Sequence, residues 1–344
     1  MIDATLDAAA RVVLSHYALS CSALRPLGNR GGFSGAALWR VQDPGGDWCL
    51  RAWPANEMDE QRIREIHFLM KRARDKGLAF VPGIRTTQYL STWVEQTGRF
   101  WELTTWMPGV AAIPGLVRRE QVEAACAALA ILHKIWVPIL PEEGTCPGVF
   151  RRLEAFREWA ERIQIALQSQ GFATHRRSPA HLRNQGITAD PIDPWAARAW
   201  QLLHFHADKI RCKLGPWFNR QVPLQPCLCD IWHDHVLFEG DVVTGLVDFG
   251  GVKTDHVAVD LARLLGSLVE DRANLRAAGL EAYTRIRPLS LLEEELVSAL
   301  DVTGVLVGLI TWLKWLYFEG MQFDDRAAAA RRLQALVERV EQWK

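Results

Sequence analysis

The stretch CLCDIWHDHVLFEGDVVTGLVDFG, residues 227–250, decides the fold of this protein. Two short apolar runs, VLF and TGLVDF, flank the turn residues EGD, and this pattern predicts a β-hairpin. Asp230 precedes the first run, and Asp248 lies near the end of the second. Because an antiparallel hairpin brings the chain back to its starting point, we expect the two carboxylates to flank a common cleft.

The overall composition is that of an ordinary globular protein. The chain has 344 residues, of which 49% are hydrophobic and 23% charged, with 40 basic and 40 acidic side chains. A formal net charge of zero gives no long-range field that would attract nucleic acid or an anionic membrane, so we expect neither partner.

The cysteines and the apolar segments indicate a cytoplasmic protein. Seven scattered cysteines without a secretory signal favour free thiols in a reducing compartment. The most apolar run, residues 302–318, contains Lys314 and follows Asp301. We therefore expect a buried helix that is too short to span a bilayer.

Hydrophobic periodicity divides the chain into two parts. Strand-like runs at 37–42, 47–53 and 100–106 surround one helical pattern at 57–77, and nearly everything after WMPG is helical. The pattern predicts an α+β fold with a small β-rich lobe, residues 1–107, and a larger helical lobe, residues 108–344. Met107, Pro108 and Gly109 would form the hinge between them.

The β-rich part contains residue types that phosphoryl transfer from ATP requires. Gly31, Gly32 and Ser34 lie in a glycine-rich turn between two strand-like runs, where backbone N–H groups could approach phosphates. Arg51 is a cation inside an apolar strand, and Glu65 on the following helix could pair with it. Each feature also has a simpler interpretation: a plain hairpin turn, a solvated edge-strand arginine and a solvated helix glutamate.

From about residue 20 to 340, and most specifically between Asp230 and Arg263, the chain resembles the aminoglycoside phosphotransferase and choline kinase superfamily, which has a bilobal protein-kinase-like fold. Its members carry His-Gly-Asp, four residues and Asn before an apolar strand, then a turn and a second strand ending in Asp. Asp230 matches the first Asp and Asp248 the metal-binding Asp. The resemblance extends to AALAILHKI, residues 127–135, and to DHVAVDLARLL, residues 255–265, where Asp260 would cap or brace a helix.

The resemblance implies an ATP-dependent phosphotransferase with Mg²⁺. Asp230 would orient the acceptor hydroxyl and take its proton, and Asp248 with help from His235 would hold the metal. Arg51, fixed by Glu65, would touch the inner phosphates under the glycine-rich turn. Adenine would lie near Thr105 and Met107 at the hinge.

The sequence departs from the family pattern at two places. Leu228 and Cys229 stand where the family has His and Gly, and His235 stands where it has the metal-binding Asn. Because Mg²⁺ prefers oxygen ligands, His235 would bind the metal through water, favour Mn²⁺, or leave Asp248 to act alone. These departures motivate a second hypothesis, a nucleotide-binding pseudokinase without turnover.

Zinc is the third hypothesis for the same stretch. Cys227, Cys229, His233 and His235 offer four ligands, but zinc pairs normally need two or more intervening residues so that the chain can turn around the ion. The spacing therefore argues against zinc.

We expect the phosphate acceptor to be the hydroxyl of a small metabolite or an aminoglycoside-like compound, and the sequence does not identify it further. An acidic cleft would suit polycationic drugs, and an aromatic cage built from Trp312, Trp315 and Tyr317 would suit quaternary amines. The sequence leaves open whether the nucleotide is ATP or GTP, and whether the protein is a monomer or a homodimer.

Overall fold

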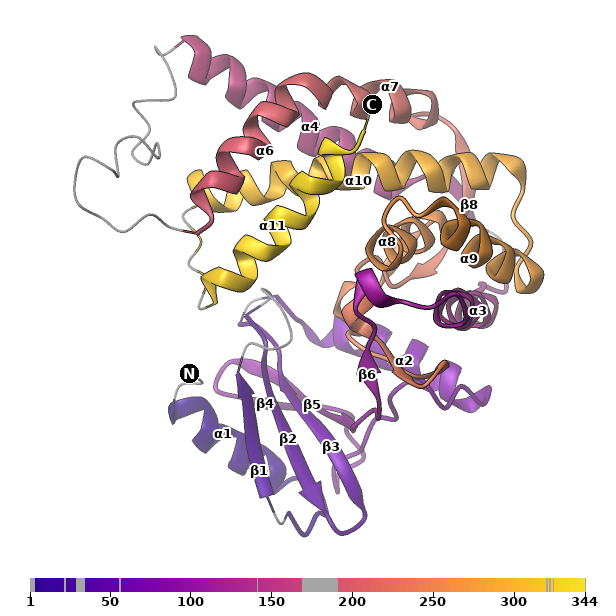
Figure 1. Ribbon diagram of the computed structural model, residues 1–344. Helices are drawn as coiled ribbons and strands as arrows, with labels where there is room; N and C mark the ends of the chain where they lie inside the picture. Colours follow the sequence, from indigo (N-terminus) through magenta and orange to yellow (C-terminus); the bar gives the residue numbers. More distant parts are fainter. Residues whose placement is uncertain are drawn as a thin grey trace, which may run out of the picture.

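An antiparallel five-stranded sheet forms the β-rich lobe (Figure 1). The computed structural model describes residues 4–21, 23–28, 35–55, 57–140, 142–168, 191–319, 321, 323 and 325–343. The strand order is β1-β2-β3-β5-β4. Its strands are β1 (Ala23–Gly28), β2 (Ala37–Asp43), β3 (Gly46–Ala52), β4 (Val94–Gln96) and β5 (Arg99–Thr105).

The two faces of this sheet serve different purposes. Helix α1 (Ala4–Leu14) covers one face, where Trp39, Leu50 and Leu103 form an apolar core with the helix. Successive side chains of a strand point to opposite faces, so Arg51 of β3 and its cross-strand partner Glu102 of β5 lie on the other face. Helix α2 (Glu60–Asp75) approaches that face, and its buried positions follow the predicted helical period.

Helices dominate the second lobe, as the sequence predicts. The long helix α10 runs through it and contacts α4, α6, α7, α8 and α11. The helices are α3 (Arg119–Trp136), α4 (Pro147–Gln168), α6 (Asp193–His206), α7 (Asp208–Leu214), α8 (Ala258–Leu268), α9 (Ala273–Ile286), α10 (Leu291–Tyr317) and α11 (Arg326–Glu341).

The predicted hairpin is present and consists of β9 (Val236–Glu239) and β10 (Val242–Leu246). Its strand β9 also pairs with β6 (Val110–Ala111), directly after the predicted hinge. The lobe has more strands than we expected, because β8 (Gln221–Cys227) pairs with β7 (Glu142–Thr145) and β11 (Lys253–Asp255). The sequence did not predict β8 because it contains prolines. A proline has no backbone N–H to donate to a neighbouring strand and therefore argues against a central strand.

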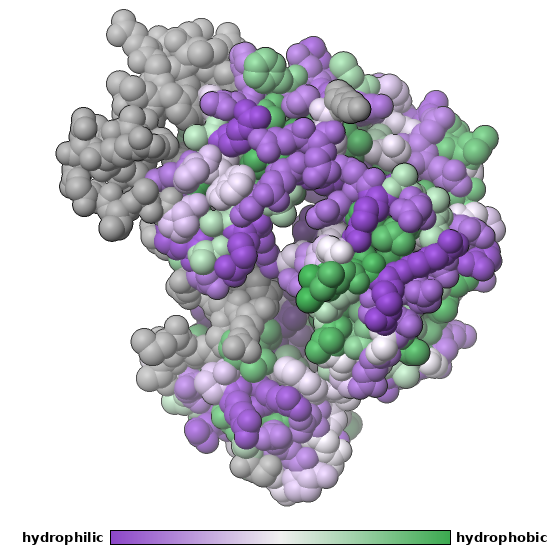
Figure 2. Space-filling model, in the orientation of Figure 1, coloured by the Kyte–Doolittle hydropathy of each residue, from purple (hydrophilic) through white to green (hydrophobic). Residues whose placement is uncertain are grey.

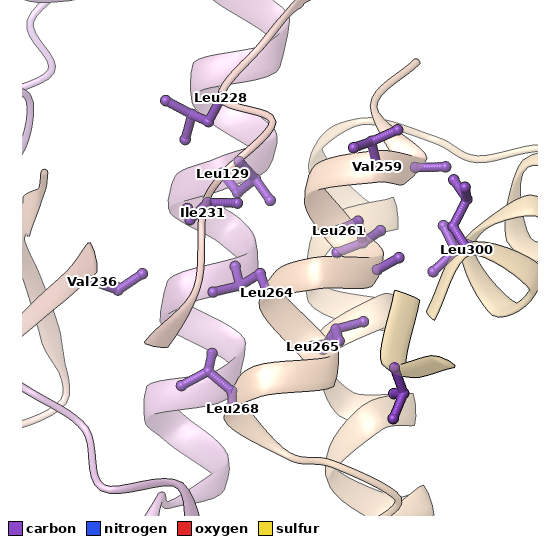
Figure 3. Close-up of a cluster of buried hydrophobic side chains, with 14 of the residues drawn as sticks. Leu129, Leu228, Ile231, Val236, Val259, Leu261, Leu264, Leu265, Leu268 and Leu300 are labelled. Carbon is purple, nitrogen blue, oxygen red and sulfur yellow. The ribbon is translucent and has the colours of Figure 1, made fainter. Parts of the chain in front are cut away.

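Apolar side chains of the larger lobe form the support under the hairpin and the loop before it (Figure 3). Leu228 and Ile231 of that loop point into the same cluster as Leu129 of α3 and the leucines of α8. All of them are at most 2% exposed. Packing of the buried Leu228 and Ile231 therefore fixes the backbone on both sides of Asp230, while the Asp230 side chain lies at the surface of the core.

Helix α10 is longer than the sequence indicated. The span Leu291–Leu316 is long and apolar enough to cross a membrane by length and composition, so the expectation of a run too short to span is wrong. However, 67% of its most apolar window is buried inside the protein, and the helices packed around it account for that burial. It is a buried helix, as expected, and a helix of this kind passes the same length test in soluble proteins.

The first turn of α10 contains a capping-box carboxylate whose pKa affects stability. Ser290 and Glu293 form a reciprocal capping box, and Glu293 also accepts hydrogen bonds from His256 Nε2 and Arg287 Nη1, each at 3.2 Å. Burial by itself raises the pKa of Glu293, but these donors outweigh it and lower the pKa from 4.5 to about 2. A carboxyl group whose pKa is lower in the folded state stabilises the fold at pH values above its unfolded pKa. This stabilisation is lost as the pH falls toward the folded pKa.

We expect the free energy of unfolding to fall by about 1–2 kcal/mol between pH 4.5 and pH 2 because of Glu293, after allowance for solvent screening. Glu293→Gln should remove this part of the pH dependence in urea denaturation, whereas the exposed neighbour Glu294→Gln should retain it. An unchanged pH profile in Glu293→Gln would show that the group does not carry the effect.

Candidate active site

The hairpin brings Asp230 and Asp248 to the same place, with His235 between them. His235 Nδ1 lies 2.9 Å from the backbone oxygen of Asp230, and its Nε2 lies 3.7 Å from Asp248 Oδ2. Val247 N–H also donates to the His235 backbone oxygen at 2.9 Å, which ties the end of β10 to the start of β9. One imidazole therefore links the backbone of Asp230 to the side chain of Asp248.

The hydrogen bonds of His235 define its tautomer. Trp232 Nε1–H donates to His235 Nε2 at 2.8 Å, so the proton of the neutral ring is on Nδ1 and is donated to the Asp230 oxygen. Burial lowers the pKa of His235, although Asp248 and Asp230 oppose this effect, and the neutral form is favoured. The only ring atom that could bind a metal, Nε2, is engaged by Trp232, a residue that the sequence analysis did not single out.

Arg51 reaches the hairpin from the opposite lobe. Its Nη1 donates to Asp248 Oδ1 at 2.8 Å, and its guanidinium lies 4.7 Å from the centre of the Trp53 ring. Burial alone would lower the pKa of Arg51, but Asp248 and Glu102 raise it above its usual value. Burial likewise raises the pKa of Asp248, but Arg51 and His235 lower it overall. Both groups are therefore held in their charged forms across the interface between the lobes.

The predicted pair of Arg51 and Glu65 is wrong. Glu65 is exposed and accepts a hydrogen bond from Gln61, one turn earlier in α2. The helix acts instead through His67, whose Nε2 is 2.7 Å from Glu102 Oε2. Glu102 Oε1 lies 3.7 Å from Arg51 Nε, directly opposite it in the sheet. The available signal was a glutamate inside the apolar run FWELTTW, but only strand pairing shows which cation it faces.

The predicted nucleotide residues are only partly described. Gly31, Gly32 and Ser34 lie outside the described residues. Thr105 ends β5 and its Oγ1 accepts the N–H of Gly83 at 2.8 Å, while Met107 is buried at the hinge. A cavity of about 370 Å³ also touches Thr105, but Trp48, another of its lining residues, lies on the sheet face opposite Arg51.

Asp260 braces the loop before the hairpin. Its two carboxylate oxygens accept the N–H groups of Leu228 and Cys229, each at 2.6 Å, and Oδ2 also pairs with buried His133 at 3.0 Å. The resemblance gave Asp260 a helix-capping or bracing role, whereas the structure assigns its oxygens to the loop. Two amide donors on one carboxylate fix the backbone immediately before Asp230.

The zinc hypothesis is not supported within the described residues. Cys227 Sγ donates to the Asp255 backbone oxygen at 3.4 Å and Cys229 Sγ to that of Lys253 at 3.8 Å, so neither joins His233 and His235. The one described group of close potential ligands is His133, Cys227 and Asp260, all buried. These atoms already hold the loop and one another, and all seven cysteines are free thiols. We interpret the group as structural.

Cys229 adopts a backbone conformation that favours glycine, with φ of +60°. An L-residue in this region costs about 1–2 kcal/mol, and a β-branched residue costs more. We expect Cys229→Val to lower the free energy of unfolding by about 2 kcal/mol. Cys229→Gly should stay within about 0.5 kcal/mol of the wild type, because relief of strain offsets the greater freedom of the unfolded chain.

Urea denaturation of both variants measures this difference. Cys212→Val, on the exposed surface of α7, controls for the loss of a thiol and should change stability by less than about 0.5 kcal/mol. Equal stability of the valine and glycine variants would contradict the strained backbone at residue 229.

Together these features define a class of protein: a bilobal, kinase-like phosphotransferase with a strand arginine facing Asp248 after the hairpin. A model of the phosphotransferase enzyme family (APH) matches residues 27–292, which is more than half of the chain. The chain therefore belongs to the phosphotransferase enzyme family. No curated protein matched the sequence.

Solved structures of small-molecule kinases share the fold over nearly the whole chain. Spectinomycin phosphotransferase APH(9)-Ia, in complex with ADP and spectinomycin, superposes with a TM-score of 0.69 at 12% identity, covering 98% of this chain and 97% of that one. Amicoumacin kinase hAmiN, in complex with AMP-PNP, Ca²⁺ and Ami, gives 0.62 at 11%, covering 98% and 93%. A microcompartment-associated aminopropanol kinase gives 0.58 at 14%, covering 98% and 97%. At these identities the likeness establishes the fold alone.

Proposed function

We propose that the protein is an ATP-dependent kinase that transfers the γ-phosphoryl group to a hydroxyl of a small molecule in the cytoplasm. The observation that carries the proposal is the arrangement of Asp230 and Asp248 on either side of His235, with Arg51 facing Asp248. Kinases of this fold are known in complex with ADP or AMP-PNP, which supports a nucleotide as the donor.

Each residue has a role that follows from its position. Asp230 has a half-exposed carboxylate, 52% accessible, that can orient an acceptor hydroxyl and receive its proton as the oxygen–phosphorus bond forms. Arg51 carries a fixed positive charge that can move from Asp248 to the inner phosphates. Glu102 keeps the arginine aimed at the hairpin during that exchange, because it contacts the opposite side of the guanidinium.

The donor set fits a divalent cation through Asp248. Its Oδ2 faces His235 Nε2, and two atoms 3.7 Å apart can share one ion once Trp232 has released the nitrogen. A divalent cation held by Asp248 would supply positive charge that offsets the negative charge of the phosphates. Direct coordination by His235 would therefore require the hydrogen bond from Trp232 to break, which weakens metal binding.

We expect His235→Asn to shift the metal preference toward Mg²⁺. An amide oxygen suits Mg²⁺ better than an imidazole nitrogen does, so the ratio of Mn²⁺ to Mg²⁺ affinity should fall about tenfold. Calorimetric titration of each metal into the ADP complex measures this ratio. His204→Asn, on the exposed face of α6, should leave it unchanged. An unchanged ratio in His235→Asn would show that His235 does not contact the ion.

A turnover assay distinguishes a kinase from a pseudokinase. His235 and Cys229 motivate the pseudokinase hypothesis. ATP consumption should be measured against a panel of small alcohols, amino alcohols, hydroxy acids and aminoglycosides with Mg²⁺ and with Mn²⁺. Acceptor-dependent ADP formation supports the kinase. No turnover with any acceptor, while ADP still raises the melting temperature, would establish nucleotide binding without catalysis.

The described aromatic residues do not favour a cage for a cationic acceptor. Trp312 is buried, and its ring lies 5.4 Å from the rings of both Trp315 and Phe323. These side chains therefore belong to the core around α10. The side chain of Tyr317 lies outside the described residues.

A further inference from the structure

Two arginines of the helical lobe lie near Asp230. Arg263 of α8 donates to Asp230 Oδ1, and Arg332 of α11 lies 3.9 Å from the centre of the Trp232 ring and 3.6 Å from Asp234. Figure 2 shows a hollow between the two lobes, bordered on the side of the helices mainly by hydrophilic residues. The predicted catalytic carboxylate therefore faces positive charge.

Arg152 of α4 belongs to the same region. A Cβ added to Gly148 would lie 2.5 Å from Val259 Cγ2, 3.2 Å from Asp255 Oδ2 and 3.3 Å from Arg152 Nη1, so these three side chains surround Gly148. Val259 and Arg263 are four residues apart in α8 and lie on one face of that helix. The charge of Arg263 also acts on Arg152, which places the two guanidinium groups in the same region.

The charge of Arg152 is poorly compensated. Its Nη1 donates to the Gly148 backbone oxygen at 2.9 Å, but its Nε is buried without a hydrogen-bond partner. No carboxylate of the described residues lies within ion-pair distance of it, since the nearby Asp255 pairs with Arg151. Burial and the charge of Arg263 lower the pKa of Arg152 to about 10, although Cys146 and Asp255 partly oppose this shift. A buried, unpaired cation is costly unless an anion binds beside it.

We propose that the acceptor is an anionic hydroxy compound, whose carboxylate or phosphate is bound between Arg263 and Arg152. This rests on the proposed kinase function. The anion takes the place of Asp230 on Arg263, which frees the Asp230 carboxylate for the acceptor hydroxyl. That hydroxyl oxygen then bonds to the γ-phosphorus, the bond to the β–γ bridging oxygen breaks, ADP leaves, and the hydroxyl proton passes to Asp230.

Guanidinium groups suit this role because their planar N–H pairs match the oxygens of carboxylates and phosphates. The same charges disfavour a polycationic acceptor, because a cation approaching Asp230 would meet Arg263 and Arg332 first. The proposal therefore separates this protein from the aminoglycoside kinases whose fold it shares.

Four small probes test the charge of the acceptor. Glycerate and glycerol 3-phosphate are anionic, glycerol is neutral and serinol is cationic, and all carry free hydroxyls. We expect both anions to raise the melting temperature of the full-length ADP complex, with calorimetric Kd values at least tenfold below those of glycerol and serinol. The difference should shrink in 300 mM salt, because screening weakens charge pairing.

Two variants locate the binding. Arg263→Gln should weaken anion binding at least tenfold, and Arg152→Met should do the same without lowering the melting temperature of the free protein. Arg331→Gln, the exposed neighbour of Arg332 in α11, makes the same charge change and should bind the anions like the wild type.

Other outcomes overturn the proposal. Binding of serinol but of neither anion would do so, as would no binding of any probe, or anion binding that is unaffected in both Arg263→Gln and Arg152→Met. The shift caused by ADP alone reports on the kinase proposal separately. ADP binding without anion binding would refute only the anionic acceptor, whereas loss of ADP binding would refute the proposed function itself.

Discussion

Asp230→Asn is expected to lower kcat about 1000-fold with any accepted substrate. An asparagine preserves the shape of the side chain but cannot take the proton of the attacking hydroxyl, and such groups contribute about 10²- to 10⁴-fold to rate. The affinity for ADP should stay within about twofold, because the contacts proposed for the nucleotide run through Arg51 and Asp248. Steady-state ADP formation and ADP titration measure the two quantities.

The control for this variant is Asp241→Asn. Asp241 lies in the turn of the same hairpin and forms an exposed pair with Arg118, so its replacement makes the same chemical change away from the site. It should leave kcat unchanged. The melting temperature of Asp230→Asn should also remain close to that of the wild type, because its pair with Arg263 is half exposed and such pairs contribute little. Retention of more than a tenth of the activity would contradict the role of Asp230.

The largest expected effect on stability is that of Asp301→Ala. Asp301 Oδ2 accepts hydrogen bonds from Arg339 at 2.6 Å and from Arg276 at 2.5 Å, and the side chains of Asp301 and Arg339 are each 7% exposed. Removal of the carboxylate leaves Arg276 without its counter-ion and leaves Arg339 with only the partly exposed Asp271. Breaking a buried ion pair in this way costs about 3–5 kcal/mol, which urea denaturation should register as a lower free energy of unfolding.

A second variant of Asp301 and a control at an exposed ion pair accompany this measurement. Asp301→Asn keeps the volume and removes the charge, and should therefore recover little of the loss. Asp208→Ala, in an exposed pair with Arg211, should cost less than about 0.5 kcal/mol. The packing is equally restrictive, since a Cβ added to Gly266 would lie 2.2 Å from Asp301 Oδ1. A loss below about 1 kcal/mol in Asp301→Ala would show that water compensates the two arginines.

The parts of the site that the sequence predicted are local. Apolar runs around EGD specify the hairpin, so the proximity of Asp230, His235 and Asp248 follows from neighbouring residues and strand periodicity. The helix carrying Glu65 was also predicted, but its partner was not. Helical periodicity shows which residues face inward, and it does not show which distant strand they meet.

The strands around Asp230 were harder to predict for a different reason. Strand β8 contains Pro223 and Pro226, which locally oppose a sheet, yet it lies between β7 and β11. Tertiary packing overrides that local preference, because the flanking leucines and the Asp260 carboxylate hold the chain that follows it.

The sequence by itself determined the two-lobed α+β architecture, the hairpin and the order of its acidic residues, because these depend on short-range periodicity and turn chemistry. Only the tertiary structure decided that Glu102 pairs with Arg51, that Trp232 engages His235 Nε2, and that Arg263 of α8 pairs with Asp230. The physical reason is that electrostatic pairing acts through space, between side chains whose separation along the chain says nothing about their distance in the fold.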